Sequence, residues 1–234
     1  MIKIGKIKLG DLPRIAVSVN DTDDIRKVKS FNVDILEIRV DQFKKLDPEY
    51  ISRVISSLRK IGIPLILTVR SKNEGGQKNV PDELKLRIFR KAISLVDAVD
   101  IELKSPIVSE VVKIAKKNKK LIIVSWHNFK LTPGDKILKS VLKGALKRGA
   151  QLVKIAVKAG KANDVSRLMK FTMRNRASNL ITISLGKKGS ISRLIFPMVG
   201  SLITYAYVTR PSGPGQIPLK KLQGFLLRNN RPVI

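Results

Sequence analysis

The sequence lacks cysteine altogether and contains one histidine, few acidic residues and few aromatic residues. Without cysteine there is no disulfide framework and no thiolate site, which agrees with a reducing compartment. Aromatic residues make up 5% of the chain, too few to provide a platform for stacked bases. The apolar runs are each shorter than about ten residues, whereas a membrane-spanning helix needs roughly 20. We therefore expect no membrane association and a cytoplasmic location.

The first ten residues alternate charged and apolar side chains and contain no continuous apolar segment. This pattern is not that of a secretory signal peptide. It predicts a short β-hairpin that turns near Gly5.

Basic residues far outnumber acidic ones, since 47 Lys and Arg against 18 Asp and Glu give a formal net charge of +29. Such a charge attracts polyanions, so a basic nucleic-acid-binding protein is one alternative. The basic residues are spread along the chain, however, with no aromatic pattern typical of RNA recognition. We expect a solvated basic surface with no dedicated nucleic-acid partner, whose field can steer an anionic substrate inward.

Short apolar runs alternate with amphipathic segments along the chain. The runs, each expected to be a strand, are 15–19, 34–40, 64–70, 98–104, 120–127, 151–158, 180–186 and 202–208. The expected helices are 21–30, 47–61, 81–96, 107–118, 135–148, 163–177, 190–199 and 218–229. Strands that alternate with helices pair in parallel, and eight such units without a linker favour a closed (β/α)8 TIM barrel. We predict one α/β domain over residues 1–234, with the hairpin closing the bottom of the barrel.

Side-chain alternation within the strands predicts a polar barrel interior. In the second run Leu36, Ile38 and Val40 share one face, which leaves Glu37 and Arg39 on the other. The polar residues expected to face the lumen are Ser18, Glu37, Arg39, Asp41, Thr68, Arg70, Asp100, Glu102, Lys104, Ser125, His127 and Lys154. Charged groups at the C-terminal ends of strands mark where barrel enzymes keep their chemistry.

Two of these residues predict imine chemistry. Lys154 lies in the apolar run 151–157, and burial is expected to lower its pKa so that a neutral, nucleophilic amine is available. His127, at the end of the preceding run, can move protons nearby. The alternative is a Lys154 ammonium group that is simply ion-paired in the interior.

The same residues stand in segments that resemble type I 3-dehydroquinate dehydratase over nearly the whole chain. The matching segments are 37–41, 68–70, 74–76, 125–129, 132–133, 153–156, 184–186, 189, 192–193, 200–201 and 212–217. The resemblance implies a (β/α)8 barrel, often a homodimer, that needs neither a metal nor an organic cofactor. Asn128 and Leu185 depart from the residues that are frequent in the family, which affects pocket shape more than reaction class.

The resemblance also implies a reaction. Lys154 would attack the ketone of 3-dehydroquinate, and His127 would take a proton from the adjacent carbon and return one to the departing hydroxyl. This syn elimination gives 3-dehydroshikimate in the shikimate pathway of aromatic amino acid biosynthesis. Glu74 would orient His127 through a hydrogen bond.

The residues expected to bind the substrate are Ser18, Glu37, Arg39, Arg70, Arg193, Ser212 and Gln216. By resemblance Arg193 holds the substrate carboxylate, and the loop from Ser212 to Gln216 closes over the site. Arg39 and Arg70 are expected to help lower the pKa of Lys154. Asp100, Glu102 and Lys104 are interpreted as structural charges in the interior. A Schiff-base aldolase on the same barrel is the second enzymatic alternative.

Overall fold

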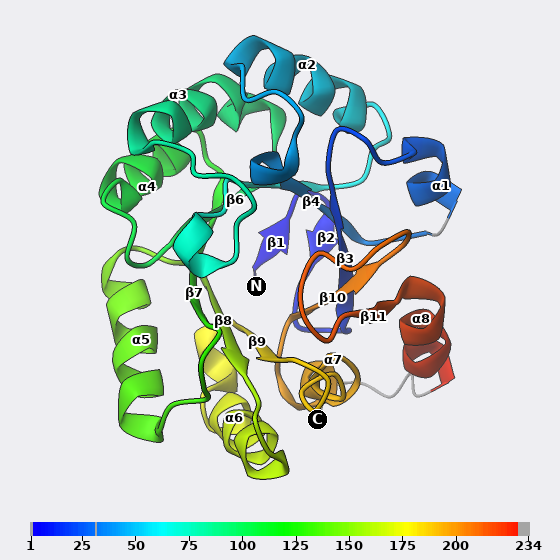
Figure 1. The fold of residues 1–234 in the computed structure, drawn as a ribbon, viewed down its shortest axis with the longest axis vertical. Helices are drawn as coiled ribbons and strands as arrows, with labels where there is room; N and C mark the ends of the chain where they lie inside the picture. Colours follow the sequence, from blue (N-terminus) through cyan, green and yellow to red (C-terminus); the bar gives the residue numbers. More distant parts are fainter. Residues whose placement is uncertain (1, 31, 229–234) are drawn as a thin grey trace.

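A parallel sheet curled into a barrel forms the centre of the computed structural model, which describes residues 2–30 and 32–228 (Figure 1). The strand order is β11–β10–β3–β4–β5–β6–β7–β8–β9, and an isolated parallel bridge joins Leu180 to Ser201 between β9 and β10. The barrel strands are β3 (Arg14–Val19), β4 (Ile35–Arg39), β5 (Leu65–Thr68), β6 (Ala98–Glu102), β7 (Leu121–Asn128), β8 (Leu152–Lys158), β9 (Leu180–Leu185) and β10 (Ile203–Tyr207). The short β11 (Ile217–Pro218) extends β10. The predicted (β/α)8 architecture is confirmed.

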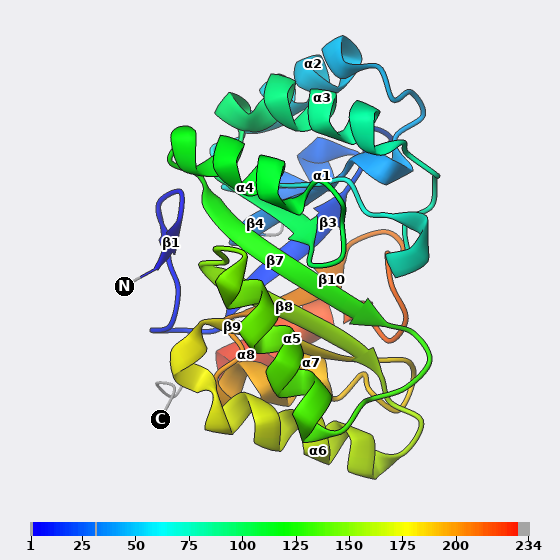
Figure 2. The same ribbon diagram turned by 90° about the vertical axis from the view of Figure 1, so that its left-hand side faces the viewer.

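Helices surround the sheet, so each strand has one face toward a helix and one toward the lumen (Figures 1 and 2). The described helices are α1 (Ile25–Ser30), α2 (Pro48–Arg59), α3 (Asp82–Ala92), α4 (Val108–Lys117), α5 (Asp135–Lys147), α6 (Ala162–Arg174), α7 (Ser192–Ile195) and α8 (Leu219–Arg228). Within the described residues no helix combines the length and the apolar character required to cross a bilayer.

Several expected helices are shorter than predicted, and two of them show the local reason. The segment 21–30 becomes helical only at Ile25, because Asn20 and Asp23 fold the preceding residues into a side-chain-bonded turn. The segment 190–199 divides into α7 and a 3-10 turn (η5, Phe196–Val199) in which Pro197 stands at the start. The predicted end of the last helix, Asn229, lies outside the described residues.

Alternation of side chains separates two apolar layers, as predicted. Leu36, Ile38 and Val40 belong to the layer between sheet and helices, whereas Ile35 and Ile66 belong to the layer inside the barrel. On β3 to β7 the inner layer comes from residues near the N-terminal ends of the strands, and the charged residues follow toward the C-terminal ends. On β8 to β10 the layer extends upward through Ala156, Ile183, Leu185 and Tyr205, so part of the upper lumen is apolar.

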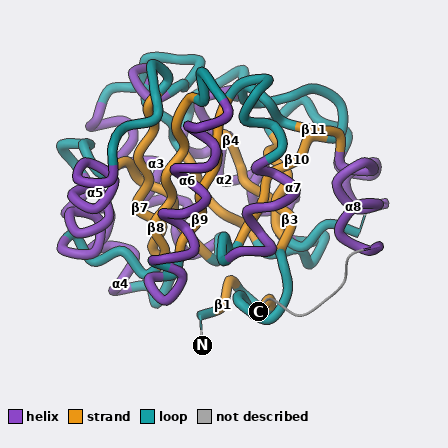
Figure 3. Tube along the Cα trace, turned by 90° about the horizontal axis from the view of Figure 1, so that it is seen from below, coloured by secondary structure: helices purple, strands orange, loops and turns teal. Residues whose placement is uncertain are grey.

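The N-terminal hairpin closes the lower end of the barrel, as predicted. Strands β1 (Lys3–Ile4) and β2 (Ile7–Lys8) pair antiparallel, and Gly5 in the turn has φ +53°. Ile4 is 0% exposed and Leu9 3% exposed, and both pack in the inner apolar layer. Figure 3 shows β1 beneath the strands, and Figure 2 shows it opposite the arrowheads of β7 and β8.

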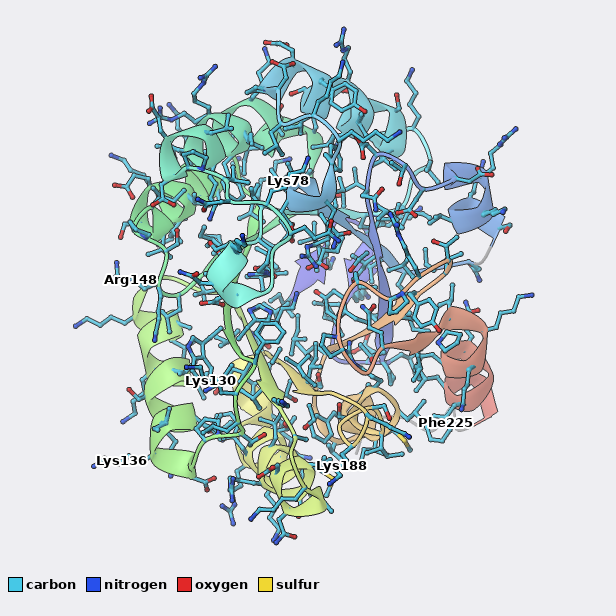
Figure 4. The ribbon with its side chains drawn as sticks, viewed as in Figure 1. Lys78, Lys130, Lys136, Arg148, Lys188 and Phe225 are labelled. Atoms are coloured by element: carbon cyan, nitrogen blue, oxygen red, sulfur yellow. The ribbon has the colours of Figure 1, made fainter. Side chains whose placement is uncertain are left out.

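Positive charge covers the outer helices. The labelled Lys136 and Arg148 lie along α5 on the outside of the molecule (Figure 4), and both side chains are exposed. The basic surface expected from the composition is therefore present, and it surrounds a lumen in which charges of both signs are buried.

The buried hairpin predicts a measurable contribution to stability. Replacing Ile4 with Ala should lower the free energy of unfolding by about 2 to 4 kcal/mol, because the change leaves a cavity in the inner layer. Urea denaturation measures this loss. The matched change Lys6→Ala, at an exposed position of the same turn, should stay within about 0.5 kcal/mol. Equal effects of the two changes would show that the hairpin is not a packed plug.

Candidate active site

Lys154 points into the upper lumen from the middle of β8 and is 5% exposed. Its Nζ lies 2.9 Å from Glu37 Oε1 and 3.1 Å from Asp100 Oδ2, and 4.3 Å from the centre of the Tyr205 ring. The amine is therefore held by two carboxylates that come from β4 and β6. In this state of the protein the ion-paired alternative describes Lys154.

The expectation that Lys154 has a lowered pKa is wrong for this state. Burial by itself lowers the pKa of the ammonium group, but Asp100 and Glu37 outweigh burial and raise the pKa above its ordinary value. Burial likewise opposes ionisation of Asp100 and Glu37, yet nearby cations hold the pKa of both carboxyl groups below the usual range. The resting site contains a cation and two anions.

Arg39 and Arg70 are each paired with an acid, and Arg70 shares Asp100 with Lys154. The charge of Arg70 lowers the pKa of Lys154, as expected, but Asp100 and Glu37 outweigh it. Arg39 forms a bidentate ion pair with Asp41, with contacts of 2.9 and 2.8 Å. Arg70 donates to Asp100 at 2.8 Å and to the hydroxyl of Ser125 at 2.7 Å. Both guanidinium groups are thus partly neutralised by carboxylates.

His127 is fixed by Glu74 at the end of β7. One oxygen of Glu74 accepts from the backbone N–H of His127 at 3.0 Å and lies 2.9 Å from Nδ1 of its ring. A proton on Nδ1 directed at this carboxylate leaves Nε2 with a free lone pair. The ring also stacks on Phe129, with centroids 6.2 Å apart and an interplanar angle of 11°.

Both members of this pair have shifted pKa values. Burial, with the positive charges of Arg70 and Lys154, places the pKa of His127 well below its ordinary value. Burial raises the pKa of Glu74 to about 7, against the opposing charge of Arg70. The imidazole is therefore neutral at neutral pH, which is the form that can accept a proton.

Arg193 is a buried cation for which the described residues provide no carboxylate within ion-pairing distance. It lies on α7 at 3% exposure, and its Nη1 donates to the backbone oxygen of Tyr205 at 3.3 Å. Its Nε has no hydrogen-bond partner within the described part of the chain. Burial lowers the pKa of Arg193 to about 10. A guanidinium group with free donors in a buried setting is suited to an anionic ligand.

The loop between β10 and β11 lies at the mouth of the site. The Ser212 backbone N–H donates to Gln216 Oε1 at 2.6 Å, and Gln216 Nε2 donates to Ser212 Oγ at 3.0 Å. Gly215 has φ +76°, and a Cβ there would lie 2.4 Å from the backbone oxygen of Gly186. Only glycine fits this approach, so the loop is seated against the end of β9.

One cavity collects every residue that the sequence singled out for the site. Its lining includes Ser18, Glu37, Arg39, Arg70, Glu74, His127, Lys154, Arg193, Ser212 and Gln216. Tyr205 and Phe129 complete its wall. Among residues 2–30 and 32–228, no group of three or more His, Asp or Glu side chains is placed to hold a metal ion.

The sequence analysis misjudged one lumen charge, Lys104. Asp100 was interpreted as a structural charge in the interior; it is buried and ion-paired, and its contact with the amine of Lys154 was not foreseen. Its position on the lumen face of β6, in register with Thr68 and Ile123, was the available signal. Lys104 was expected in the interior but is exposed, because β6 ends at Glu102 and a turn follows.

An amine, an imidazole and guanidinium groups gathered in the upper lumen, toward the C-terminal ends of the parallel strands, define the active site of a (β/α)8-barrel enzyme. The family model described as "Type I 3-dehydroquinase" matches residues 13–229. The 3-dehydroquinate dehydratase of Hydrogenobaculum sp. (strain Y04AAS1) is 37% identical over 211 residues, which cover 89% of this chain and 95% of that protein.

Solved structures of 3-dehydroquinate dehydratases are also similar to this chain. The crystal structure of 3-dehydroquinate dehydratase from Geobacillus kaustophilus HTA426 has a TM-score of 0.91 and 30% identity, covering 98% of this chain and 96% of that one. The type I enzyme from Clostridium difficile, solved with covalent modified comenic acid, has a TM-score of 0.89 and 32% identity, covering 97% and 96%. The chain belongs to the type I 3-dehydroquinase family. This membership decides between the lyase and aldolase expectations in favour of the lyase.

The raised pKa of Glu74 makes stability depend on pH. Because the folded protein holds this proton more tightly than the unfolded chain does, the stabilisation is present below about pH 4.5 and is lost as pH rises through about 7. The unfolding free energy of the wild type, relative to Glu74→Gln, should fall by about 2 to 3 kcal/mol between pH 5 and pH 8. Urea denaturation across this range measures it. If the difference in unfolding free energy between the two proteins does not change with pH, the raised pKa of Glu74 is contradicted.

Proposed function

We propose that this chain is a 3-dehydroquinate dehydratase that works through an imine on Lys154. It removes water from 3-dehydroquinate to give 3-dehydroshikimate, a hydro-lyase reaction of the shikimate pathway. Family membership supports the reaction. The observation that carries the mechanism is that Lys154, His127 and Arg193 line one cavity. The covalent modified ligand in the Clostridium difficile relative supports covalent chemistry in this family.

Glu37 and Asp100 have a role beyond holding the resting ammonium group. Lys154 must give up its proton transiently to attack the ketone, and either carboxylate is close enough to accept it. Once the protonated imine forms, the positive charge returns to the same nitrogen. Carboxylates that raise the pKa of the ammonium group also favour the cationic imine. That cation is the acceptor of the electrons released when the neighbouring C–H bond breaks.

His127 is the base for that C–H bond and then the acid for the leaving hydroxyl. Its low pKa keeps Nε2 unprotonated before the reaction, and Glu74 fixes the ring through Nδ1. As the imidazolium forms, the Glu74 carboxylate stabilises it. One residue can serve both transfers because the proton that it removes from carbon leaves with the hydroxyl as water.

The remaining polar groups recognise the substrate. Arg193 supplies the donors for its carboxylate, and Ser18, Glu37, Arg39 and Arg70 line the part of the cavity available to its hydroxyls. The loop with Ser212 and Gln216 closes over the bound molecule and keeps bulk water from the imine.

We also propose features that rest on the resemblance. The chain is a homodimer in the cytoplasm, forms a single domain over residues 1–234, and needs no cofactor or metal. Its exposed basic side chains act as a general attraction for an anionic substrate and have no dedicated nucleic-acid partner.

The mechanism predicts that Lys154→Ala abolishes the ultraviolet absorbance rise of the conjugated enone. The expected loss in kcat is at least about 10³-fold, because no other described lysine lines the cavity. Borohydride with substrate should add a stable mass to the wild-type peptide that contains Lys154. Lys158→Ala, at an exposed position of the same strand, should retain activity within about twofold. Enone formation by Lys154→Ala at the wild-type rate would refute the mechanism.

Binding of the substrate carboxylate by Arg193 predicts a defect in KM. Arg193→Gln should raise KM by about 10- to 100-fold, which corresponds to the loss of a charge-assisted hydrogen bond of about 1.5 to 3 kcal/mol. Steady-state kinetics measure it, and Arg174→Gln on the outside of α6, where the side chain is 67% exposed, is the control. An unchanged KM in Arg193→Gln would remove Arg193 from substrate recognition.

A further inference from the structure

A second hollow borders the His127–Glu74 pair. This hollow, which we call the side cleft, lies between the β5–α3 loop and the ends of β6 and β7. Among the described residues, its lining includes neither Lys154, nor Arg193, nor any part of the 211–216 loop. The side cleft is therefore an approach to the catalytic histidine that does not pass through the substrate mouth.

Three residues form the wall between the two hollows. Glu74, His127 and Phe129 line both the substrate cavity and the side cleft. Phe129 is 37% exposed and stacks on His127, and its ring fills the space that a Cβ on Gly75 would need. The partition between the two hollows therefore includes the side chain that transfers the proton from carbon to the leaving hydroxyl in the proposed mechanism.

Buried polar groups line the side cleft behind this wall. Glu102 is 2% exposed, and its Oε1 accepts from the backbone N–H of Ser71 at 2.6 Å. Glu102 Oε2 and Ser105 Oγ have no hydrogen-bond partner in the described part of the chain. Lys85, 3% exposed, donates to Ser71 Oγ. A carboxylate oxygen can only accept, so its complement is a small donor, and water satisfies such groups in protein interiors.

The chemistry of the site requires that water moves while the cavity is full. Imine formation releases one water as the ketone oxygen leaves with two protons. Elimination releases a second, made of the hydroxyl and the proton taken from carbon. Hydrolysis of the product imine consumes one water, whose oxygen becomes the product ketone while Lys154 regains its proton. The net result is one water released, but three water transfers occur at a covalently occupied site.

We propose that the side cleft is the route by which these water molecules pass to and from His127 while the substrate mouth is closed. Glu102, Ser105 and Lys85 hold water at its inner end, and Phe129 and His127 form the gate. The inference rests on the proposed imine mechanism. Glu102 also pairs with Arg70 at 3.5 Å, and the inference gives its unpartnered oxygen and the buried Lys85 a further role.

The absence of native cysteine allows a direct test. Lys104→Cys and Asn79→Cys place single thiols at exposed positions on two walls of the side cleft, and Ser140→Cys on α5 is the matched control outside it. Each variant is labelled with a bulky aromatic methanethiosulfonate, and mass spectrometry checks that labelling is complete. Dithiothreitol later removes the label. Measurements are kcat, KM and the fraction of enzyme that borohydride traps as the Lys154 adduct during turnover.

Blocking the side cleft should slow imine hydrolysis. Labelled Lys104→Cys and Asn79→Cys should lose about 10-fold in kcat, with a parallel fall in KM and a larger trapped fraction, because the covalent intermediate accumulates. Dithiothreitol should restore activity, and labelled Ser140→Cys should behave as unlabelled protein. A structural disturbance would lower kcat without raising the trapped fraction, and that result counts against the route.

The remaining outcomes separate this inference from the proposed function. If the adduct forms normally and full labelling leaves kcat and the trapped fraction unchanged, the water route is wrong and the imine mechanism stands. If unlabelled wild-type protein forms no Lys154 adduct, the imine mechanism is wrong, and so is the water route that rests on it.

Discussion

The positive charge on Lys154 is the feature around which the upper lumen is arranged. Glu37 and Asp100 reach the amine from two strands that are not adjacent, so the cation sits near the barrel axis. Removing either acid would leave an under-compensated buried cation, and removing the lysine would leave two close carboxylates. The three side chains are therefore coupled. The same charge reappears on the protonated imine, so one arrangement suits both the resting and the reacting states.

The carboxylates are themselves fixed by neighbours on other strands. Glu37 accepts hydrogen bonds from Ser18 at 2.8 Å and Thr68 at 3.3 Å, while Asp100 accepts from Ser125 at 2.6 Å. These partners come from β3, β5 and β7, so the network depends on the register of the barrel. A shift of one residue between any two strands would turn the polar side chains toward the helices. The apolar inner layer below and the hairpin beneath it hold that register.

Local sequence signals were sufficient for the strands and their faces, and insufficient for the electrostatics of the site. Alternation placed Glu37 and Lys154 in the lumen because period two is a property of each strand by itself. The raised pKa of Lys154 depends on a contact between residues 117 positions apart, which no strand pattern contains. Arg70 does lower the pKa of Lys154, as predicted, but its pairing with Asp100 could be seen only in three dimensions. The prediction of helix ends was wrong where Asn20 and Pro197 redirect the backbone.

The positions of the carboxylates also explain why Lys154 is charged in the resting site while His127 is neutral. Lys154 has two carboxylates within 3.1 Å, so its positive form is stabilised. His127 has one, and Glu74 has a pKa of about 7 because burial and Glu102 disfavour its charge. The imidazole therefore stays neutral beside a cation, as a base for a C–H bond must. Arrival of a proton on His127 favours ionisation of Glu74, because the new positive charge lies 2.9 Å away. Where Glu74 is already ionised, protonation of His127 converts the hydrogen bond between them into an ion pair.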